Sequence, residues 1–309
     1  MGLTAVTGAS GFVGTHLIEE MRQRGLPVRG VSRQKKPELV TIPSYDPEVD
    51  WTAYLADVDV VVHLAARVHV MRETSKDPLA QFQAANVDAT LNLAQQAAHA
   101  GVKRFVFVST IKVNGETTAP GKPFTADDPP DPQDPYAISK AEAEAALRAL
   151  GDESGMEVVI IRPPLVYGPG VGGNFRSLIK WAQSGLPDPF GKINNKRSLV
   201  YVGNLCDLLI EVVAHPSSAN RTFLVADAET LSTNELMAKL IAASGKTRRS
   251  FRCSQKVLMG LAALAGQKQA ADRLLSSLQV DCRSTCDALD WTPPFTSDEG
   301  LRRTVTTAM

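Results

Sequence analysis

The sequence has little of what marks a metalloprotein or a disulfide-stabilised protein. Its 309 residues include only four cysteines, at positions 206, 253, 282 and 286. None of their spacings is typical of a metal site or a redox motif. Cys282 and Cys286 are four residues apart, which predicts neighbouring packing positions on a helix. We therefore expect no metal centre and a protein of a reducing compartment.

An excess of charge of one sign is also absent, because 33 Lys and Arg residues balance 33 Asp and Glu residues. No basic stripe indicates nucleic acid, and no polybasic run indicates a membrane surface. The longest apolar stretch, about residues 257–265, is too short to span a bilayer. A glycine-rich loop begins so near Met1 that we expect no targeting segment before it. These features predict a soluble, cytoplasmic protein without membrane insertion.

What the sequence does contain is an alternation of apolar strands and amphipathic helices. Runs of strand-forming residues occur at 3–6, 27–32, 58–64, 105–108 and 158–161, and helical patterns occur at 15–24, 82–100 and 136–150. The 58–64 run is nearly continuous in β-branched residues, as in a parallel strand that is buried on both faces. The pattern predicts an α/β fold with a Rossmann-type, doubly wound parallel sheet.

The character of the chain changes after Arg162, where proline and glycine become frequent. Strand-like runs return at 199–202 and 222–225, and the chain is mostly helical from about residue 231. We therefore predict a dinucleotide-binding domain formed by residues 1–165 plus about 199–228. Residues 166–198 and 229–309 form a smaller, mostly helical substrate-binding region interleaved with it.

A glycine-rich loop follows the first strand and opens the first helix, which is the context that a dinucleotide fingerprint requires. Gly8 permits the tight turn, Gly11 lets the backbone approach a pyrophosphate, and Gly14 lets helix and strand pack closely. The helix amino terminus then offers amide donors to the phosphates. We expect Ser10, Phe12 and Val13 of this loop to contact the cofactor as well.

The end of the second strand bears on the choice between the two nicotinamide cofactors. A carboxylate at this point would bind the ribose 2′-hydroxyl, whereas an arginine accommodates a 2′-phosphate. The chain has Ser32 and Arg33 and no carboxylate there. We therefore favour NADP(H), with NAD(H) as the open alternative.

Three further residues form a candidate catalytic set. Tyr136 and Lys140 are four residues apart and face one side of a helix. An ammonium near a phenol favours the phenolate, so we expect Lys140 to lower the pKa of Tyr136 and to hold the nicotinamide ribose. Thr110, at the carboxyl end of its strand, can bond the substrate oxygen that Tyr136 protonates. By contrast, we expect His63, at the end of a buried strand, to be packed or hydrogen-bonded rather than catalytic.

With these motifs in order, the chain resembles the extended short-chain dehydrogenase/reductase family, in its nucleotide-sugar epimerase/dehydratase branch. The matching stretches are residues 7–14, 63–66, 86–87, 109–110, 136–140, 162–169, 174–175 and 197–202. The resemblance implies that cofactor contacts come from Leu64, Ala65, Ala66, Asn86, Val108, Ser109, Pro163 and Val166. It implies that the substrate diphosphate is held by Asn174 and Arg197, with Arg273 as a second arginine whose surroundings match poorly.

Departures from the family pattern narrow the activity. The 4,6-dehydratases carry an Asp-Glu pair after the catalytic threonine, whereas Ile111 and Lys112 stand there in this chain. The 4-epimerases typically have a tyrosine at Asn114 and an amide at Leu165. Residues 63–71 and 109–116 look more like the bacterial subgroup of 4-reductases that form UDP-N-acetylquinovosamine, a precursor of surface polysaccharide.

The resemblance therefore implies reduction of the C4 ketone of a UDP-2-acetamido-2,6-dideoxy-4-hexulose. A UDP-glucose or UDP-N-acetylglucosamine 4-epimerase is the alternative within the family. A non-catalytic NAD(P)-binding sensor is a third possibility, although a sensor has no need of the intact Thr110, Tyr136 and Lys140 set. The family also implies a homodimer through a four-helix bundle, for which the alanine-rich segments 82–100 and 136–150 are suited.

Overall fold

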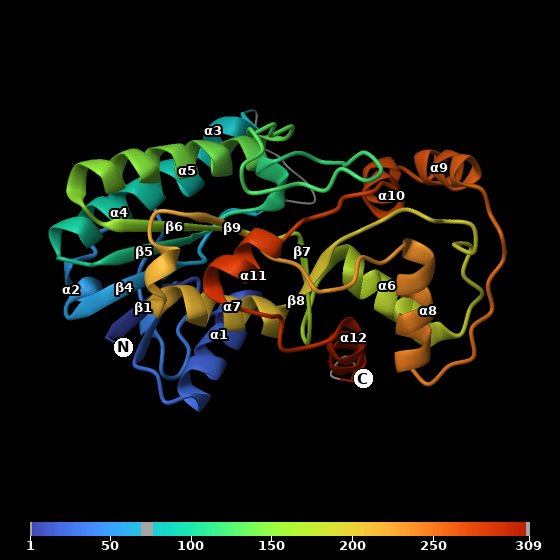
Figure 1. The fold of residues 1–309 in the computed structure, drawn as a ribbon, viewed down its shortest axis with the longest axis horizontal. Helices are drawn as coiled ribbons and strands as arrows, with labels where there is room; N and C mark the ends of the chain where they lie inside the picture. Colours follow the sequence, from blue (N-terminus) through green and yellow to red (C-terminus); the bar gives the residue numbers. More distant parts are fainter. Residues whose placement is uncertain (1, 69–76, 307–309) are drawn as a thin grey trace.

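The structure, a computed structural model, describes residues 2–68 and 77–306, so positions 69–71 of the subgroup segment lie outside the described residues. A seven-stranded sheet, parallel throughout, runs in the order β3-β2-β1-β4-β5-β6-β9 (Figure 1). In chain order its strands are β1 (Leu3–Thr7), β2 (Val28–Ser32), β3 (Val40–Thr41), β4 (Val58–His63), β5 (Arg104–Val108), β6 (Glu157–Arg162) and β9 (Thr222–Leu224). The predicted doubly wound parallel sheet is confirmed.

Both faces of this sheet are covered by helices (Figure 1). Successive residues of a strand point to opposite faces, so Val6 and Val62 pack into one core while Ala5 and Val61 pack into the other. The first core lies against α1 (Phe12–Gln23) and α7 (Val202–Ala214), and the second against α4 (Ala89–His99) and α5 (Pro135–Ser154). Burial on both faces explains the nearly continuous apolar strands of the sequence.

The single helix predicted over 82–100 is wrong in detail. The segment is divided into α3 (Pro78–Gln83), a π-helical turn η1 (Ala84–Asp88) and α4. A π turn holds one extra residue, and such turns are frequent at functional sites. Here the turn contains Asn86, whose side chain is buried.

The chain leaves the large sheet after β6, and the strand-like run at 199–202, predicted to belong to the dinucleotide-binding domain, does not return to that sheet. β7 (Leu165–Tyr167) and β8 (Leu199–Tyr201) form a separate two-stranded parallel sheet, and only β9 rejoins the large one. The remaining helices and turns are α2 (Thr52–Leu55), η2 (Ile111–Val113), α6 (Gly173–Ser184), η3 (Pro216–Ser218), α8 (Thr233–Ala243), α9 (Gln255–Leu264), α10 (Lys268–Leu275), α11 (Arg283–Leu289) and α12 (Ser297–Thr306).

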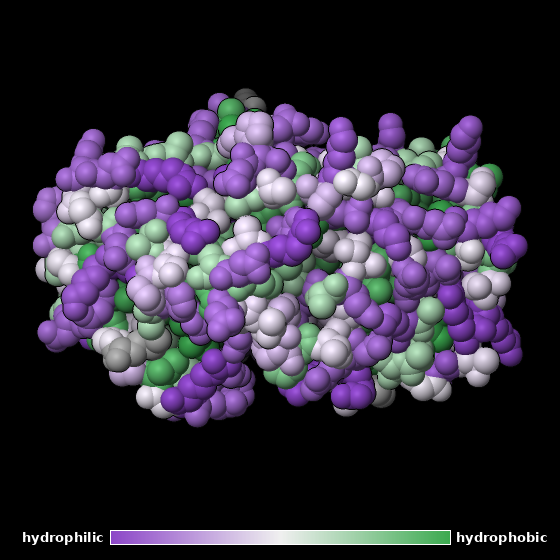
Figure 2. Space-filling model, viewed as in Figure 1, coloured by the Kyte–Doolittle hydropathy of each residue, from purple (hydrophilic) through white to green (hydrophobic). Residues whose placement is uncertain are grey.

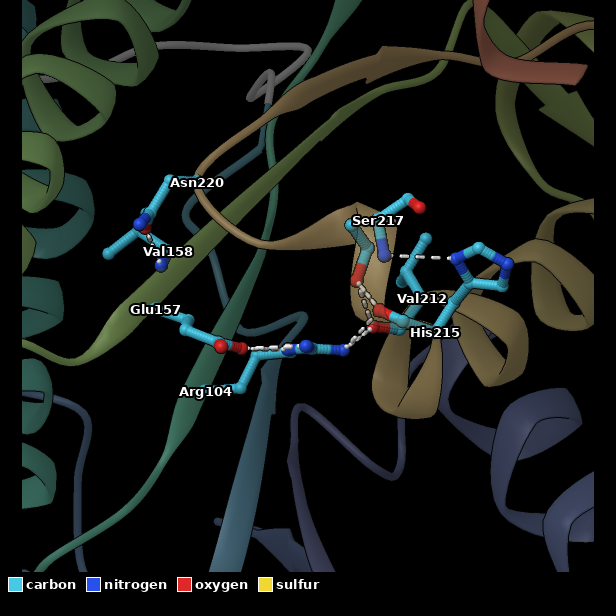
Figure 3. A network of polar contacts seen from close by, with 8 residues as sticks. Arg104, Glu157, Val158, Val212, His215, Ser217 and Asn220 are labelled. Carbon is cyan, nitrogen blue, oxygen red and sulfur yellow. Dashed lines mark hydrogen bonds and ion pairs between the residues drawn. The ribbon is translucent and has the colours of Figure 1, made fainter. Parts of the chain in front are cut away.

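A buried arginine fastens α7 to the amino-terminal edge of the sheet (Figure 3). Arg104, the first residue of β5, donates hydrogen bonds to the carbonyl oxygens of Val212, at 2.6 Å, and His215, at 3.1 Å. Its Nε donates to Glu157 at 2.7 Å. The last carbonyls of a helix lack partners within the helix, and a cation there also complements the helix dipole. These hydrogen bonds anchor α7 at the amino-terminal ends of the strands. We expect ligands at the carboxyl-terminal ends, as in other open α/β sheets.

The surface view shows a mainly hydrophilic face that is hollowed between α1 and α12 (Figure 2). A cleft of about 450 Å³ at these helices is lined by both acidic and basic side chains, among them Glu19, Glu20, Arg302 and Arg303. None of the helices described is both long and apolar enough to cross a membrane.

Candidate cofactor cleft and catalytic site

A larger cleft of about 770 Å³ lies at the carboxyl ends of β1, β2 and β4, where open α/β sheets bind their ligands. The glycine loop contributes Gly8, Ser10, Gly11, Phe12, Val13 and Gly14 to its walls. Other segments contribute Arg33, Leu64, Ala65, Ala66 and Val166. The structure thus brings these predicted cofactor residues together around one cavity.

The backbone of the glycine loop leaves no room for side chains at two positions. Gly8 has a φ of 68°, and a Cβ there would lie 2.8 Å from the Ala65 nitrogen. A Cβ on Gly14 would lie 2.3 Å from the Gly8 carbonyl oxygen. Gly14 therefore permits close contact with the loop itself, rather than only between helix and strand as the sequence predicts. Helix α1 begins at Phe12, so its amino terminus faces the cleft.

The wall beyond β2 contains residues that the sequence did not single out. The Gly8 amide donates to the Tyr45 hydroxyl at 2.8 Å, and this hydroxyl donates to the Val31 carbonyl oxygen at 2.9 Å. The Arg33 guanidinium lies 5.7 Å from the centre of the Tyr45 ring. Asp46 also lines the cleft. Tyr45 lies well past the end of β2 and belongs to no motif, so no local signal identifies it.

Ser32 and Ser109 mark two polar positions near the cleft. The Ser32 hydroxyl donates to the Ser10 hydroxyl at 2.7 Å, which joins the end of β2 to the glycine loop. The Ser109 hydroxyl, one residue beyond Val108, is buried and has no hydrogen-bond partner among the described residues. A buried hydroxyl without a hydrogen-bond partner costs free energy, and a ligand that bonds to it removes this cost. Together with the tight glycine loop, it fits a bound dinucleotide.

Asn86 and Pro163 support the cleft instead of lining it. The Asn86 amide accepts a hydrogen bond from the Arg67 nitrogen at 2.8 Å and donates to the Ser139 hydroxyl at 3.0 Å. It therefore ties the segment after β4 to α5. The Pro163 carbonyl accepts from the Ile111 amide at 2.9 Å, which fixes the chain just beyond Thr110.

Helix α5, which carries the candidate catalytic residues, begins one residue before Tyr136. Asp134 caps it by accepting a hydrogen bond from the Ala137 amide at 2.7 Å, and Pro135 occupies the first turn. Lys140 is 1% exposed, and its ammonium lies 3.7 Å from the centre of the Phe107 ring on β5. Burial lowers the pKa of Lys140 to about 7, although the Glu144 carboxylate opposes this shift.

The expected lowering of the Tyr136 pKa is not found. Burial raises the pKa of Tyr136 to about 12, and the Asp134 carboxylate acts in the same direction. The physical reason is that the phenol is removed from water while the nearest influential charge is negative. Tyr136 is therefore protonated at neutral pH and suited to donate a proton. Thr110, 9% exposed at the end of β5, accepts a hydrogen bond from the Lys112 amide at 3.3 Å.

His63 has the structural role that its position predicts. Its Nδ1 is 2.7 Å from the Thr7 hydroxyl and its Nε2 is 3.0 Å from the Thr90 hydroxyl. Burial lowers the pKa of His63 to about 3, and Lys140 acts in the same direction. A neutral, hydrogen-bonded ring is what a core histidine requires.

Of the three residues predicted to hold a diphosphate, the two arginines lie near charged groups of the catalytic segments. Burial lowers the pKa of Arg197 to about 10, while Glu116 opposes this shift. Burial would raise the pKa of Asp134, but Lys112, the Ala137 amide and Arg273 together lower it. Lys112 bridges Glu116 and Asp134 at 2.6 and 2.5 Å. Asn174 is exposed in the first turn of α6.

The two departures used to separate epimerase from reductase differ in the structure. Asn114 is 3% exposed, accepts a hydrogen bond from Arg162 at 3.0 Å and donates to the Thr125 carbonyl oxygen at 2.9 Å. The Asn114 amide therefore bonds to groups of the protein itself. Leu165, in contrast, is 42% exposed at the start of β7, one residue before the cleft residue Val166.

Comparison with known proteins places this site in context. Residues 4–226 match the family described as "NAD dependent epimerase/dehydratase family". The UDP-glucose 4-epimerase of Vibrio cholerae is 42% identical over 305 residues, which cover 97% of this chain and 93% of that protein.

Solved structures agree with this match. MoeE5 in complex with UDP-glucuronic acid and NAD superposes with a TM-score of 0.78 at 25% identity, covering 99% of this chain and 98% of that one. The UDP-glucose 4-epimerase of Thermus thermophilus in complex with NAD gives a TM-score of 0.77 at 25% identity, again covering 99% and 98%.

Proposed function

We propose that this chain, which belongs to the NAD-dependent epimerase/dehydratase family, transfers a hydride at C4 of a UDP-linked hexose. The observation that carries the proposal is the arrangement of Thr110, Tyr136 and Lys140 beside a cleft walled by the glycine loop. The names of the similar proteins, which bind NAD and UDP-sugars, support the same class of substrate.

A reduced dinucleotide held by the glycine loop would supply the hydride to the C4 carbon in the reductive direction. The Tyr136 hydroxyl gives its proton to the C4 oxygen, so ketone, hydride and proton become an alcohol. Thr110 donates a hydrogen bond to the same oxygen and stabilises its developing negative charge. The buried Lys140 ammonium stabilises the phenolate that Tyr136 leaves behind, and the diphosphate is held by Arg197 with Asn174 and Arg273.

Within this chemistry we propose a 4-reductase that acts on a UDP-2-acetamido-2,6-dideoxy-4-hexulose. One observation favours it. Leu165 presents an apolar, half-exposed side chain where related epimerases usually have an amide. The second candidate, a UDP-glucose or UDP-N-acetylglucosamine 4-epimerase, is favoured by the 42% identical Vibrio cholerae relative.

Cofactor turnover separates the two candidates. A reductase consumes one reduced cofactor per product, whereas an epimerase returns the hydride to the same sugar and keeps its cofactor. We expect stoichiometric loss of NAD(P)H absorbance on addition of the UDP-4-keto-6-deoxy-N-acetylhexosamine. We also expect no interconversion of UDP-glucose with UDP-galactose, or of their N-acetyl forms. Epimer formation without net cofactor oxidation would establish the second candidate, and dinucleotide binding without any UDP-sugar turnover would indicate a sensor.

The cofactor and assembly proposals rest on separate features. We propose a preference for NADP(H) because Arg33 lines the cleft at the end of β2, although Asp46 on the same wall keeps NAD(H) open. We also propose a homodimer in which α4 and α5, adjacent on one face of the sheet (Figure 1), pair with their symmetry mates. A monomeric mass by light scattering at micromolar concentration would contradict the dimer.

A further inference from the structure

A buried ion pair links chain segments that carry the candidate catalytic residues. Glu144 and Arg162 are 3% and 4% exposed. The Arg162 Nε donates to both Glu144 carboxylate oxygens, at 3.0 and 3.2 Å, and Nη2 donates at 2.5 Å. Nη1 donates to the Asn114 amide oxygen at 3.0 Å. Burying two charges is costly even when they are paired and hydrogen-bonded. A role other than stability would explain why both charges lie in the interior.

The positions of the three residues in the chain supply that reason. Glu144 is one helical turn beyond Lys140 on α5, Asn114 is four residues beyond Thr110, and Arg162 immediately precedes Pro163. The network therefore joins three segments: α5 with Tyr136 and Lys140, the loop that carries Thr110, and the segment at Pro163 that is expected beside the nicotinamide. The Arg162 guanidinium contacts the first two segments, and Arg162 itself belongs to the third.

The charges around Lys140 give the network an electrostatic role as well. Lys140 lies against the ring of Phe107 on β5, near neutral His63 on β4 and one turn after Tyr136 on its own helix. Arg162 on β6 is paired with Glu144. Lys112 in η2 is paired with both Glu116 and Asp134. Glu144 is the carboxylate that favours the charged form of Lys140.

We propose that Glu144, Arg162 and Asn114 are positioning residues for the reaction: their network holds α5, β6 and the Thr110 loop in register, and the Glu144 carboxylate, one helical turn from Lys140, favours the ammonium form of that lysine. The inference deepens the proposed hydride transfer and rests on it. It assigns the buried carboxylate a function in catalysis without contact with the substrate.

The decisive variant is Glu144→Gln, which keeps the size and hydrogen-bonding oxygen but removes the charge. The pKa of Lys140 then falls further, so we expect kcat at neutral pH to drop about tenfold or more, because an opposite charge on the neighbouring helical turn can shift a pKa by roughly one to three units. Activity should recover as the pH is lowered and Lys140 regains its proton. Glu144→Asp retains the charge, so its pH profile should stay in place.

A second readout does not depend on catalysis. In protein labelled with ¹³C at lysine side chains, the Lys140 resonance, assigned with Lys140→Arg, should titrate at lower pH in Glu144→Gln than in the wild type. Absence of turnover in the wild type would defeat the proposed function alone. If Lys140 in folded Glu144→Gln titrated at the same pH as in the wild type, the electrostatic part of this inference would be overturned.

The geometric part is tested with Asn114→Ala, which leaves both buried charges paired and so remains informative even if Glu144→Gln fails to fold. We expect a severalfold lower kcat with an unshifted pH profile. Wild-type kcat in this variant would overturn the geometric part. The matched control is Glu153→Gln, the same chemical change at an exposed position of the same helix, where kcat, pH profile and titration should all be unchanged.

Discussion

The glycine loop and the segments around α6 and α9 differ in how closely the chain packs against their glycines. In the loop, Cβ atoms added at Gly8 or Gly14 would lie under 3 Å from backbone atoms. Around α6 and α9, glycines 172, 173, 185 and 260 have nothing within 4 Å of such an atom. Large apolar side chains are also left exposed there, for example Leu261 at 58% and Leu264 at 89% on α9.

Under the proposed function, this difference separates a fixed part of the site from a variable part. A dinucleotide has one shape, and the loop proposed to hold it is tightly packed. Sugars differ, and exposed, loosely packed segments tolerate change at low cost. We therefore expect the glycine loop and the candidate catalytic residues to set the hydride chemistry, and the proposed substrate-binding region to set the choice of sugar.

The largest expected effect lies at the candidate catalytic tyrosine. Tyr136→Phe removes the proton donor and leaves the ring in place against Phe82, whose ring centre is 6.1 Å away. Turnover should fall by about 10² to 10⁴, as for loss of a general acid, with cofactor affinity little changed. Steady-state kinetics with dinucleotide titration checks this, and near-normal turnover would remove Tyr136 from the mechanism.

A pair of glycine substitutions tests the contrast between the glycine loop and the α9 region directly. Gly14→Ala places a methyl group 2.3 Å from the Gly8 carbonyl oxygen and should cost about 1–3 kcal/mol of stability through overpacking. Gly260→Ala, inside α9 with open space around it, should instead stabilise the protein by about 0.5–1 kcal/mol. Denaturant unfolding measures both, and equal shifts of the same sign would refute the contrast.

The smallest expected effect concerns the choice of cofactor at the cleft beside β2. If Arg33 grips a 2′-phosphate, Arg33→Ala should weaken NADPH binding roughly tenfold, or about 1.4 kcal/mol, and leave NADH binding unchanged. Binding titrations with both cofactors provide the comparison. Equal affinity of the wild type for NADPH and NADH would show that Arg33 does not select.

The sequence predicted those parts of the site that depend on neighbours in the chain. The glycine loop and the Tyr136–Lys140 spacing are local patterns, and their elements are where the patterns place them. The π turn at Asn86 was not predictable, because helical periodicity does not reveal one added residue. Tyr45 reaches Gly8 from 37 positions away, and Arg162 reaches Asn114 across 48, so their roles exist only in the folded chain.

The return of β9 to the large sheet has a consequence for synthesis on the ribosome. β6 ends at Arg162, and its partner β9 begins only at Thr222, 60 positions later. At about 5–20 residues per second, translation takes roughly 3–12 seconds to supply that partner. During this interval β6, with Val159 and Ile160 fully buried in the finished protein, presents an unpaired apolar edge. The nascent chain thus has a period of vulnerability to aggregation, which ends when its last strand emerges.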